Sequence, residues 1–147
     1  MTKEEHYKSL LPQVKSLCES ESDIIAKMAN VSALLHYEFG FWWTGFYRVL
    51  NNELLLGPFQ GPIACVHIAH GRGVCGTAWK ERRTIVVPDV EEFPGHIACS
   101  SESRSEIVVP VFKDNEIIAV LDIDSRDLAT FDDIDRQWLE EVVKFIP

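Results

Sequence analysis

Apolar residues recur every three or four positions over the first forty residues, which predicts two consecutive amphipathic helices. The apolar positions of the first helix are Tyr7, Leu10, Leu11, Val14, Leu17 and Cys18. Those of the second helix are Ile24, Ile25, Met28, Val31, Leu34 and Leu35. Ser22-Asp23 precedes the second helix and is a favourable N-terminal cap.

After residue 40 the pattern changes to short apolar runs bounded by turn residues, which is typical of β-strands. We predict strands over 41–49, 53–59, 65–69, 84–87, 107–112 and 116–124, a short helix over 74–82 and a closing helix from residue 130 or 132 to 146. Asn51-Asn52 and the turn at 113–115 each close a hairpin. The sequence therefore predicts an α+β fold, with a mostly antiparallel sheet flanked by helices.

Length and composition indicate one domain over residues 1–147 with a single sizeable core, since 46% of the residues are hydrophobic. The net charge of -9 argues against nucleic acid and anionic membranes as partners, because both attract basic patches. No apolar run approaches the roughly 18 residues of a membrane span. The polar N-terminus does not resemble a signal peptide. We expect a cytoplasmic protein whose cysteines are reduced at rest, so that a disulfide would be transient and catalytic.

Three central cysteines are the main candidates for chemistry: Cys65, Cys75 and Cys99. Their spacing is too wide for a local metal knuckle, but three thiols that meet in space can run a redox cycle. By itself, Cys65 at a strand start is more typical of a core residue. Cys18, on the apolar side of the first helix, is also predicted to be core.

Cys75 and Cys99 are both plausible nucleophiles. Cys75 lies in a glycine-rich turn, residues 71–76, at the start of a helix, where the pKa of a thiol can fall. Cys99 lies in the long connection 88–105, and His96 and Arg104 are near it in sequence. Each could equally be a spectator or a small residue needed by its loop. Local sequence does not rank one above the other.

Acidic residues provide candidate proton donors. Asp122 and Asp124 flank Ile123 at the end of a nearly all-apolar strand, so both side chains should lie on one face. Glu106 begins the neighbouring strand and could join them. Two carboxylates at a buried strand end repel, so at least one is expected to hold a proton near neutral pH, as a general acid must. A solvated strand end is the alternative.

Aromatic residues on the first strand provide a candidate apolar wall. Trp43 and Tyr47 should share one face, and Gly45 between them should leave room for a small apolar group. Ordinary core packing is the alternative.

Three other interpretations are weaker. Gly71-x-Gly73-x-x-Gly76 matches the dinucleotide fingerprint, but the flanking hairpins are not the parallel βαβ unit that this motif requires. The underlying helix start could still hold a small anion. A metal set drawn from Cys65, His67, His70, Cys75 and Cys99 lacks any standard zinc spacing. No nucleophile-elbow sequence supports a serine hydrolase.

These residues fall within longer stretches, 42–47, 57–65, 71–78 and 121–125, together with Cys99 and Glu106. The stretches span nearly the whole chain and resemble the free methionine-(R)-sulfoxide reductases, a family of GAF-domain proteins. A GAF domain in general does not need three cysteines at these places. The resemblance implies a GAF-like, six-stranded sheet and a homodimer. It also implies an L-methionine (R)-S-oxide reductase that acts on the free amino acid and excludes methionine sulfoxide within a peptide.

The resemblance also implies a role for each residue. Cys99 corresponds to the nucleophile, Cys65 to the main resolving cysteine and Cys75 to an auxiliary one. The substrate-facing residues are Glu106, Asp122 and Asp124 around the sulfoxide oxygen and head group, and Trp43 and Tyr47 around the methyl group. The resemblance further implies that thioredoxin, itself recycled with NADPH, is the external electron donor. It implies no bound metal, flavin or nicotinamide. The alternative function is a GAF sensor module that binds a small ligand without turnover.

Overall fold

The computed structural model describes residues 1–96 and 102–147. Its elements, in chain order, are α1 (Lys3–Glu19), α2 (Ile24–Phe39), β1 (Trp43–Leu50), β2 (Glu53–Gln60), β3 (His67–Ala69), α3 (Gly73–Glu81), β4 (Ile85–Val87), η1 (Val90–Glu92), β5 (Ser105–Lys113), β6 (Glu116–Ser125), α4 (Asp133–Val142) and η2 (Val143–Phe145).

Six strands form one antiparallel sheet in the order β3-β2-β1-β6-β5-β4. The hairpins β1–β2 and β5–β6 meet at the centre, where β1 pairs with β6. Two-residue turns with positive φ close both hairpins, at Asn51-Asn52 and Asp114-Asn115. Asparagine and aspartate tolerate this conformation better than most residues, which explains their place in the turns.

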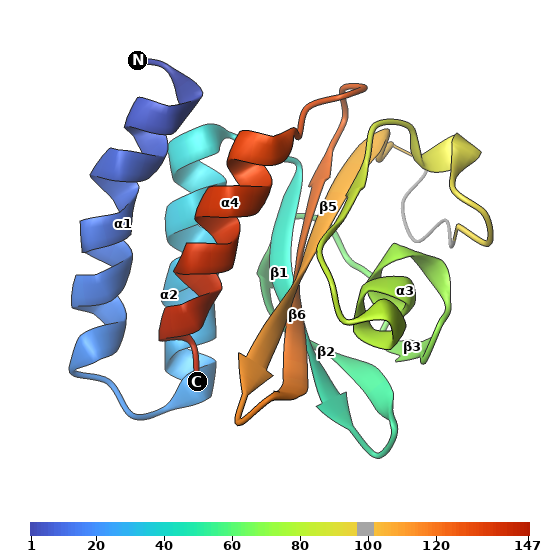
Figure 1. Ribbon diagram of the computed structural model, residues 1–147, viewed down its shortest axis with the longest axis horizontal. Helices are drawn as coiled ribbons and strands as arrows, with labels where there is room; N and C mark the ends of the chain where they lie inside the picture. The colour runs from blue at the N-terminus through green and yellow to red at the C-terminus, as the bar shows by residue number, and fades with distance from the viewer. Residues whose placement is uncertain (97–101) are drawn as a thin grey trace.

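The helices α1, α2 and α4 cover one face of the sheet, and α3 lies on the other (Figure 1). Side chains alternate across each strand, so neighbouring residues belong to different cores. Ile107, Leu121 and Ile123 pack beneath the three-helix layer. Val108 and Val120 pack on the opposite face, with residues of α3. The sheet therefore separates a purely structural layer from the layer that holds the candidate site.

A buried polar contact joins the first helix to the last. Asp135 of α4 is 2% exposed, and it accepts hydrogen bonds from Lys3 Nζ (2.7 Å) and Tyr7 Oη (2.6 Å). Asp135 also completes a capping box with Asp132 at the start of α4. The contact fixes α1 against α4 across the helical layer.

The structure confirms the predicted α+β fold and corrects several boundaries. The third strand begins at His67 rather than residue 65, so Cys65 precedes it. The fifth strand begins at Ser105, which brings Glu106 into the regular ladder. The closing α-helix begins at Asp133 and ends in the 3-10 turn η2. Within the described ranges, no helix has the length and apolar character needed to cross a membrane.

Candidate active site

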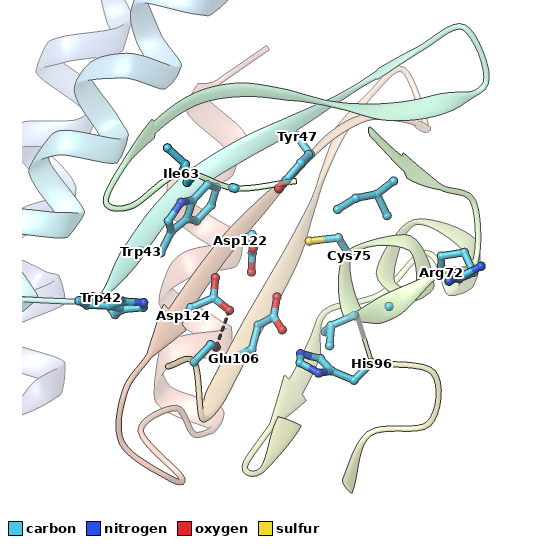
Figure 2. A pocket seen from close by; sticks show the side chains of 15 residues that line it. Trp42, Trp43, Tyr47, Ile63, Arg72, Cys75, His96, Glu106, Asp122 and Asp124 are labelled. Carbon is cyan, nitrogen blue, oxygen red and sulfur yellow. Dashed lines mark hydrogen bonds between the residues drawn. The ribbon is translucent and has the colours of Figure 1, made fainter. Parts of the chain in front are cut away.

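A cavity lies between the sheet face that α3 covers and the N-terminus of α3 itself (Figure 2). Strands β1, β5 and β6 form its floor, and the segment 63–64 with His96 and Ser103 completes its wall. The lining residues named in the sequence analysis are Trp43, Tyr47, Cys75, Glu106, Asp122 and Asp124. The described candidates therefore converge on one site, apart from Cys65, whose carbonyl adjoins it through Tyr47.

Strand register explains the convergence of the three carboxyl groups. Asp122 and Asp124 are two residues apart on β6, so their side chains share a face, as predicted. Glu106 of β5 pairs directly with Asp124, and Trp43 of β1 pairs with Asp124 from the other side. Figure 2 shows the three carboxyl groups directed toward one another within the cavity.

Burial makes these carboxyl groups unusual acids. Glu106 and Asp122 are each only 6% exposed. Burial, followed by the charge of Asp122, raises the pKa of both Glu106 and Asp124 well above the ordinary values. Burial also raises the pKa of Asp122. Each of these acids therefore holds its proton to a higher pH than an exposed carboxyl group does, which is the direction that the sequence analysis expected.

The hydrogen bonding of the acids is incomplete. Ser103 Oγ donates to Asp124 Oδ1 at 3.1 Å. Asp122 Oδ1 is buried and has no hydrogen-bond partner among the described residues. Such a group is costly unless another molecule satisfies it. The arrangement is suited to a ligand that brings a hydrogen-bond donor or a positive charge.

The expectation of a lowered pKa for Cys75 is wrong. Cys75 is in the first turn of α3, but it is 5% exposed and faces Asp122 and Glu106. Burial, followed by the charges of Asp122, Glu106 and Asp124, raises the pKa of this thiol well above its ordinary value. Burial and negative neighbours outweigh the effect of the helix end. In this environment Cys75 is a thiol and a weak nucleophile.

The two aromatic rings lie together at one end of the cavity, but the space predicted between them is filled. The centroids of Trp43 and Tyr47 are 6.0 Å apart. A Cβ atom on Gly45 would lie 2.3 Å from Cβ of Phe59, which stacks on Trp43 at 5.1 Å. Gly45 therefore makes room for Phe59 and the Trp43 ring rather than for a ligand. The rings of Trp43 and Tyr47 therefore line the cavity from one side and do not enclose a space between them.

The aromatic residues also hold the segment that contains Cys65. Trp43 Nε1 donates to the carbonyl of Pro62 at 3.0 Å, and Tyr47 Oη donates to the carbonyl of Cys65 at 2.8 Å. Cys65 is half-buried and disulfide-bonded, so it is not the core cysteine that its position alone suggested. Cys18 is a free, buried thiol in the helical layer, as predicted. The predicted nucleophile, Cys99, lies outside the described residues.

The glycines of the fingerprint-like motif have local structural roles. Gly71 and Gly73 adopt positive φ, and a Cβ on Gly76 would lie 2.6 Å from the carbonyl oxygen of Ala69. Every pairing in the described sheet is antiparallel, which rules out a Rossmann unit there. Arg72, the N-cap residue of α3, makes no side-chain capping hydrogen bond, and Gly73 and Val74 of the first turn line the cavity.

Among the described residues, the two histidines of the weaker metal interpretation lie away from Cys75. His67 is paired with Glu53 at 2.6 Å on the exposed side of β3, and His70 packs against the Trp79 ring at 4.5 Å. Neither histidine lines the cavity with Cys75.

Comparison with known proteins gives close relatives along the whole chain. A GAF domain family model matches residues 20–146. The free methionine-R-sulfoxide reductase of Escherichia coli (strain K12) is 46% identical over 144 residues, which are 97% of this chain and 87% of the relative. The Neisseria meningitidis free methionine-R-sulfoxide reductase, solved in complex with its substrate, aligns with a TM-score of 0.97 and 51% identity over 99% of this chain and 89% of that one. A substrate complex of fRMsr of Staphylococcus aureus aligns with a TM-score of 0.91 and 55% identity over 95% and 92%.

This chain belongs to the free methionine-R-sulfoxide reductase family of GAF-domain proteins. The family assignment confirms the resemblance found in the sequence. The cavity of this protein is also lined by residues that were not predicted as site residues, among them Trp42, Ile63, His96 and Ser103. The guanidinium carbon of Arg126 lies 4.4 Å from the ring centroid of Trp42. A positive charge therefore lies beside the cavity. The aromatic run that begins at Trp42 is a sequence signal for that residue, but only the fold places it at the cavity.

Proposed function

We propose that this protein reduces free L-methionine (R)-sulfoxide to methionine with electrons from its own thiols. The observation that carries the proposal is the cluster of buried carboxyl groups with raised pKa values beside the wall formed by Trp43 and Tyr47. A sulfoxide needs a proton on its oxygen to be reduced, and its methyl group needs an apolar surface. Similarity to free methionine-R-sulfoxide reductases from several organisms supports the same conclusion.

The reaction begins with the thiolate of Cys99 attacking the sulfoxide sulfur. A protonated carboxyl group, Glu106 or Asp124, gives its proton to the sulfoxide oxygen. The hydroxyl group passes from the substrate sulfur to the Cys99 sulfur as the bond between the two sulfur atoms breaks, so methionine leaves and Cys99 becomes a sulfenic acid. The two electrons that reduce the substrate come from the cysteine sulfur. Asp122 holds the head group and shares the proton equilibrium of the cluster, since the three acids titrate together.

Resolution then forms a disulfide. The Cys65 thiol condenses with the Cys99 sulfenic acid, and one water is released. The disulfide-bonded state of Cys65 supports this role. Cys75, a free thiol with a raised pKa, is the auxiliary resolving residue. Thioredoxin, recycled with NADPH, restores the thiols by exchange, so the catalytic cycle needs no bound metal, flavin or nicotinamide.

Both ends of the amino acid have partners in the cavity. The acidic cluster attracts the α-ammonium, and the unpaired Asp122 Oδ1 supplies an acceptor for it. The N–H groups of Gly73 and Val74, at the start of α3, suit the α-carboxylate. A peptide-bound residue has neither free group. We therefore propose that the site selects the free amino acid and excludes methionine sulfoxide within peptides.

We further propose that residues 1–147 work as one GAF domain in a cytoplasmic homodimer. The contact of Lys3 and Tyr7 with Asp135 supports the single domain, because it joins the two ends of the chain. Size-exclusion chromatography with light scattering tests the dimer.

Cysteine variants with disulfide mapping by mass spectrometry test the chemistry. One equivalent of free methionine (R)-sulfoxide, added to the reduced protein, should yield one methionine and a Cys65–Cys99 disulfide. Cys99→Ser should abolish methionine formation. Cys65→Ser should retain the first turnover, and Cys18→Ala is the matched control with full activity. Substantial turnover by Cys99→Ser would contradict the assigned nucleophile.

A further inference from the structure

Three potential metal ligands, one thiol and two carboxyl groups, meet inside the cavity. One ligand atom each of Cys75, Glu106 and Asp122 lies within 4.8 Å of the other two. Figure 2 shows the Cys75 sulfur reaching from α3 toward the carboxyl groups of the sheet. All three residues are buried, with exposures of 5–6%. The cluster therefore differs from a solvated group of surface acids.

A second observation, an unsatisfied oxygen of Asp122, favours a positively charged ligand at the same place. Asp122 Oδ1 is buried, lines the cavity and has no hydrogen-bond partner among the described residues. Cysteine thiolates and carboxylates are both zinc ligands in proteins, with Zn–S near 2.3 Å and Zn–O near 2.0–2.2 Å. Tetrahedral geometry then places the ligand atoms about 3.5 Å apart, which side-chain rotation can reach from the observed spacing.

We propose that Cys75, Glu106 and Asp122 bind Zn²⁺ or a similar divalent transition metal, with a fourth position open to water in the cavity. The mixed thiolate and carboxylate ligands select such a metal over Mg²⁺ or Ca²⁺, which take oxygen ligands alone. Three protein ligands and an open position are the usual composition of an accessible zinc site.

Two of the proposed ligands, Cys75 and Glu106, must lose protons before they bind a metal. Burial raises the pKa of Cys75 and Glu106 above their ordinary values, so both groups hold their protons more strongly than exposed ones do. Zinc binds the deprotonated forms and must release these protons. Metal affinity therefore rises with pH.

Competition with substrate follows, and this part rests on the proposed function. The metal would neutralise Asp122 and Glu106 and fill the space beside them. Methionine sulfoxide and metal should then exclude each other, and zinc should inhibit turnover reversibly.

Cobalt titration tests the site directly, because Co²⁺ bound to a thiolate gives a near-ultraviolet charge-transfer band. The full chain is used without reductant, so that Cys65 stays in its disulfide and Cys75 remains free. We expect one Co²⁺ per chain with this band, displaced by Zn²⁺. Cys75→Ala should remove the band and weaken zinc binding by more than about 100-fold, beyond the loss typical of an outer-shell partner. Glu106→Gln should weaken binding while retaining the band at higher metal concentration.

Cys18→Ala is the matched control, since Cys18 is the other buried free thiol and lies across the sheet. It should bind cobalt like the parent protein. Absence of the band in the parent, or its persistence in Cys75→Ala, would overturn the site. Addition of free methionine (R)-sulfoxide should displace cobalt. Cobalt binding without displacement would retain the metal site and contradict only the shared substrate position.

Discussion

Glu106 and Asp124 are direct cross-strand partners on β5 and β6, and their carboxyl groups enter the same cavity. Directly opposed like charges destabilise a sheet unless protons are retained. The pairing therefore lowers stability when both groups are ionised. The proton that relieves this repulsion is also one that can be given to a substrate.

Replacing Glu106 with glutamine should stabilise the protein at alkaline pH. Because burial raises the folded-state pKa of Glu106 above its ordinary 4.5, the folded chain binds more protons above that pH than the unfolded chain. The free energy of unfolding of the parent should fall as pH rises through this window. Glu106→Gln should recover about 1.4 kcal/mol for each unit by which the pKa is raised. Urea unfolding at about pH 5 and pH 8 measures the difference.

Exposed Glu116 gives the control for that experiment. Glu116→Gln should change the free energy of unfolding little at either pH. An equal change in both variants, or a loss of stability on alkaline pH only in Glu106→Gln, would contradict the shared-proton arrangement.

The acid step should appear in the pH dependence of turnover. The donor must be protonated, so kcat/KM should fall as pH rises through the raised pKa of the cluster. Removing the donor should lower kcat by about 10²–10⁴-fold and should abolish this alkaline limb. Separate rate profiles of Glu106→Gln and Asp124→Asn identify which carboxyl group is the donor. Two unchanged profiles would exclude both.

Tyr47→Phe tests whether the aromatic wall also positions Cys65. The variant keeps the ring but loses the hydrogen bond from Tyr47 Oη to the Cys65 carbonyl. A net hydrogen bond is worth about 1 kcal/mol, so disulfide formation after the first turnover should slow about fivefold. Rapid-quench mapping of the disulfide measures this step, and Tyr37→Phe at an exposed site is the control. Equal rates in the two variants would leave Tyr47 with a packing role alone.

Tyr7→Phe should destabilise the helical layer without affecting catalysis. The change leaves buried Asp135 without the 2.6 Å hydrogen bond and should cost about 1–3 kcal/mol. Tyr37, which is 77% exposed, again gives the control, with little expected change. Urea unfolding and steady-state kinetics measure both effects. A loss of kcat with unchanged stability would contradict the separation of the two layers.

Local pattern was sufficient to predict most of the fold. Apolar periodicity in the first helices, the hairpin turns and the alternation of Asp122 and Asp124 act over a few residues, so the sequence displays them. Register between strands then follows from the short turns, which is why Glu106 could be placed near the two aspartates.

The remaining features depend on contacts between distant segments. The raised pKa of Cys75 arises from α3 docking against Asp122, and a helix start alone predicts the opposite shift. The space beside Gly45 is filled by Phe59 of the next strand, in a hairpin with an irregular register. Tyr7 and Asp135 meet although 128 residues separate them. None of these contacts has a local sequence signal.

The central claim is turnover of one epimer of one free amino acid. The measurement is thioredoxin-coupled NADPH oxidation with the R and S epimers of free methionine sulfoxide and with a peptide that contains the R epimer. We expect NADPH oxidation with the free R epimer and none with the S epimer or the peptide. Cys99→Ser should lose the NADPH oxidation with the free R epimer. Binding of the free R epimer without NADPH oxidation by the parent protein would contradict the account and would indicate a sensor domain.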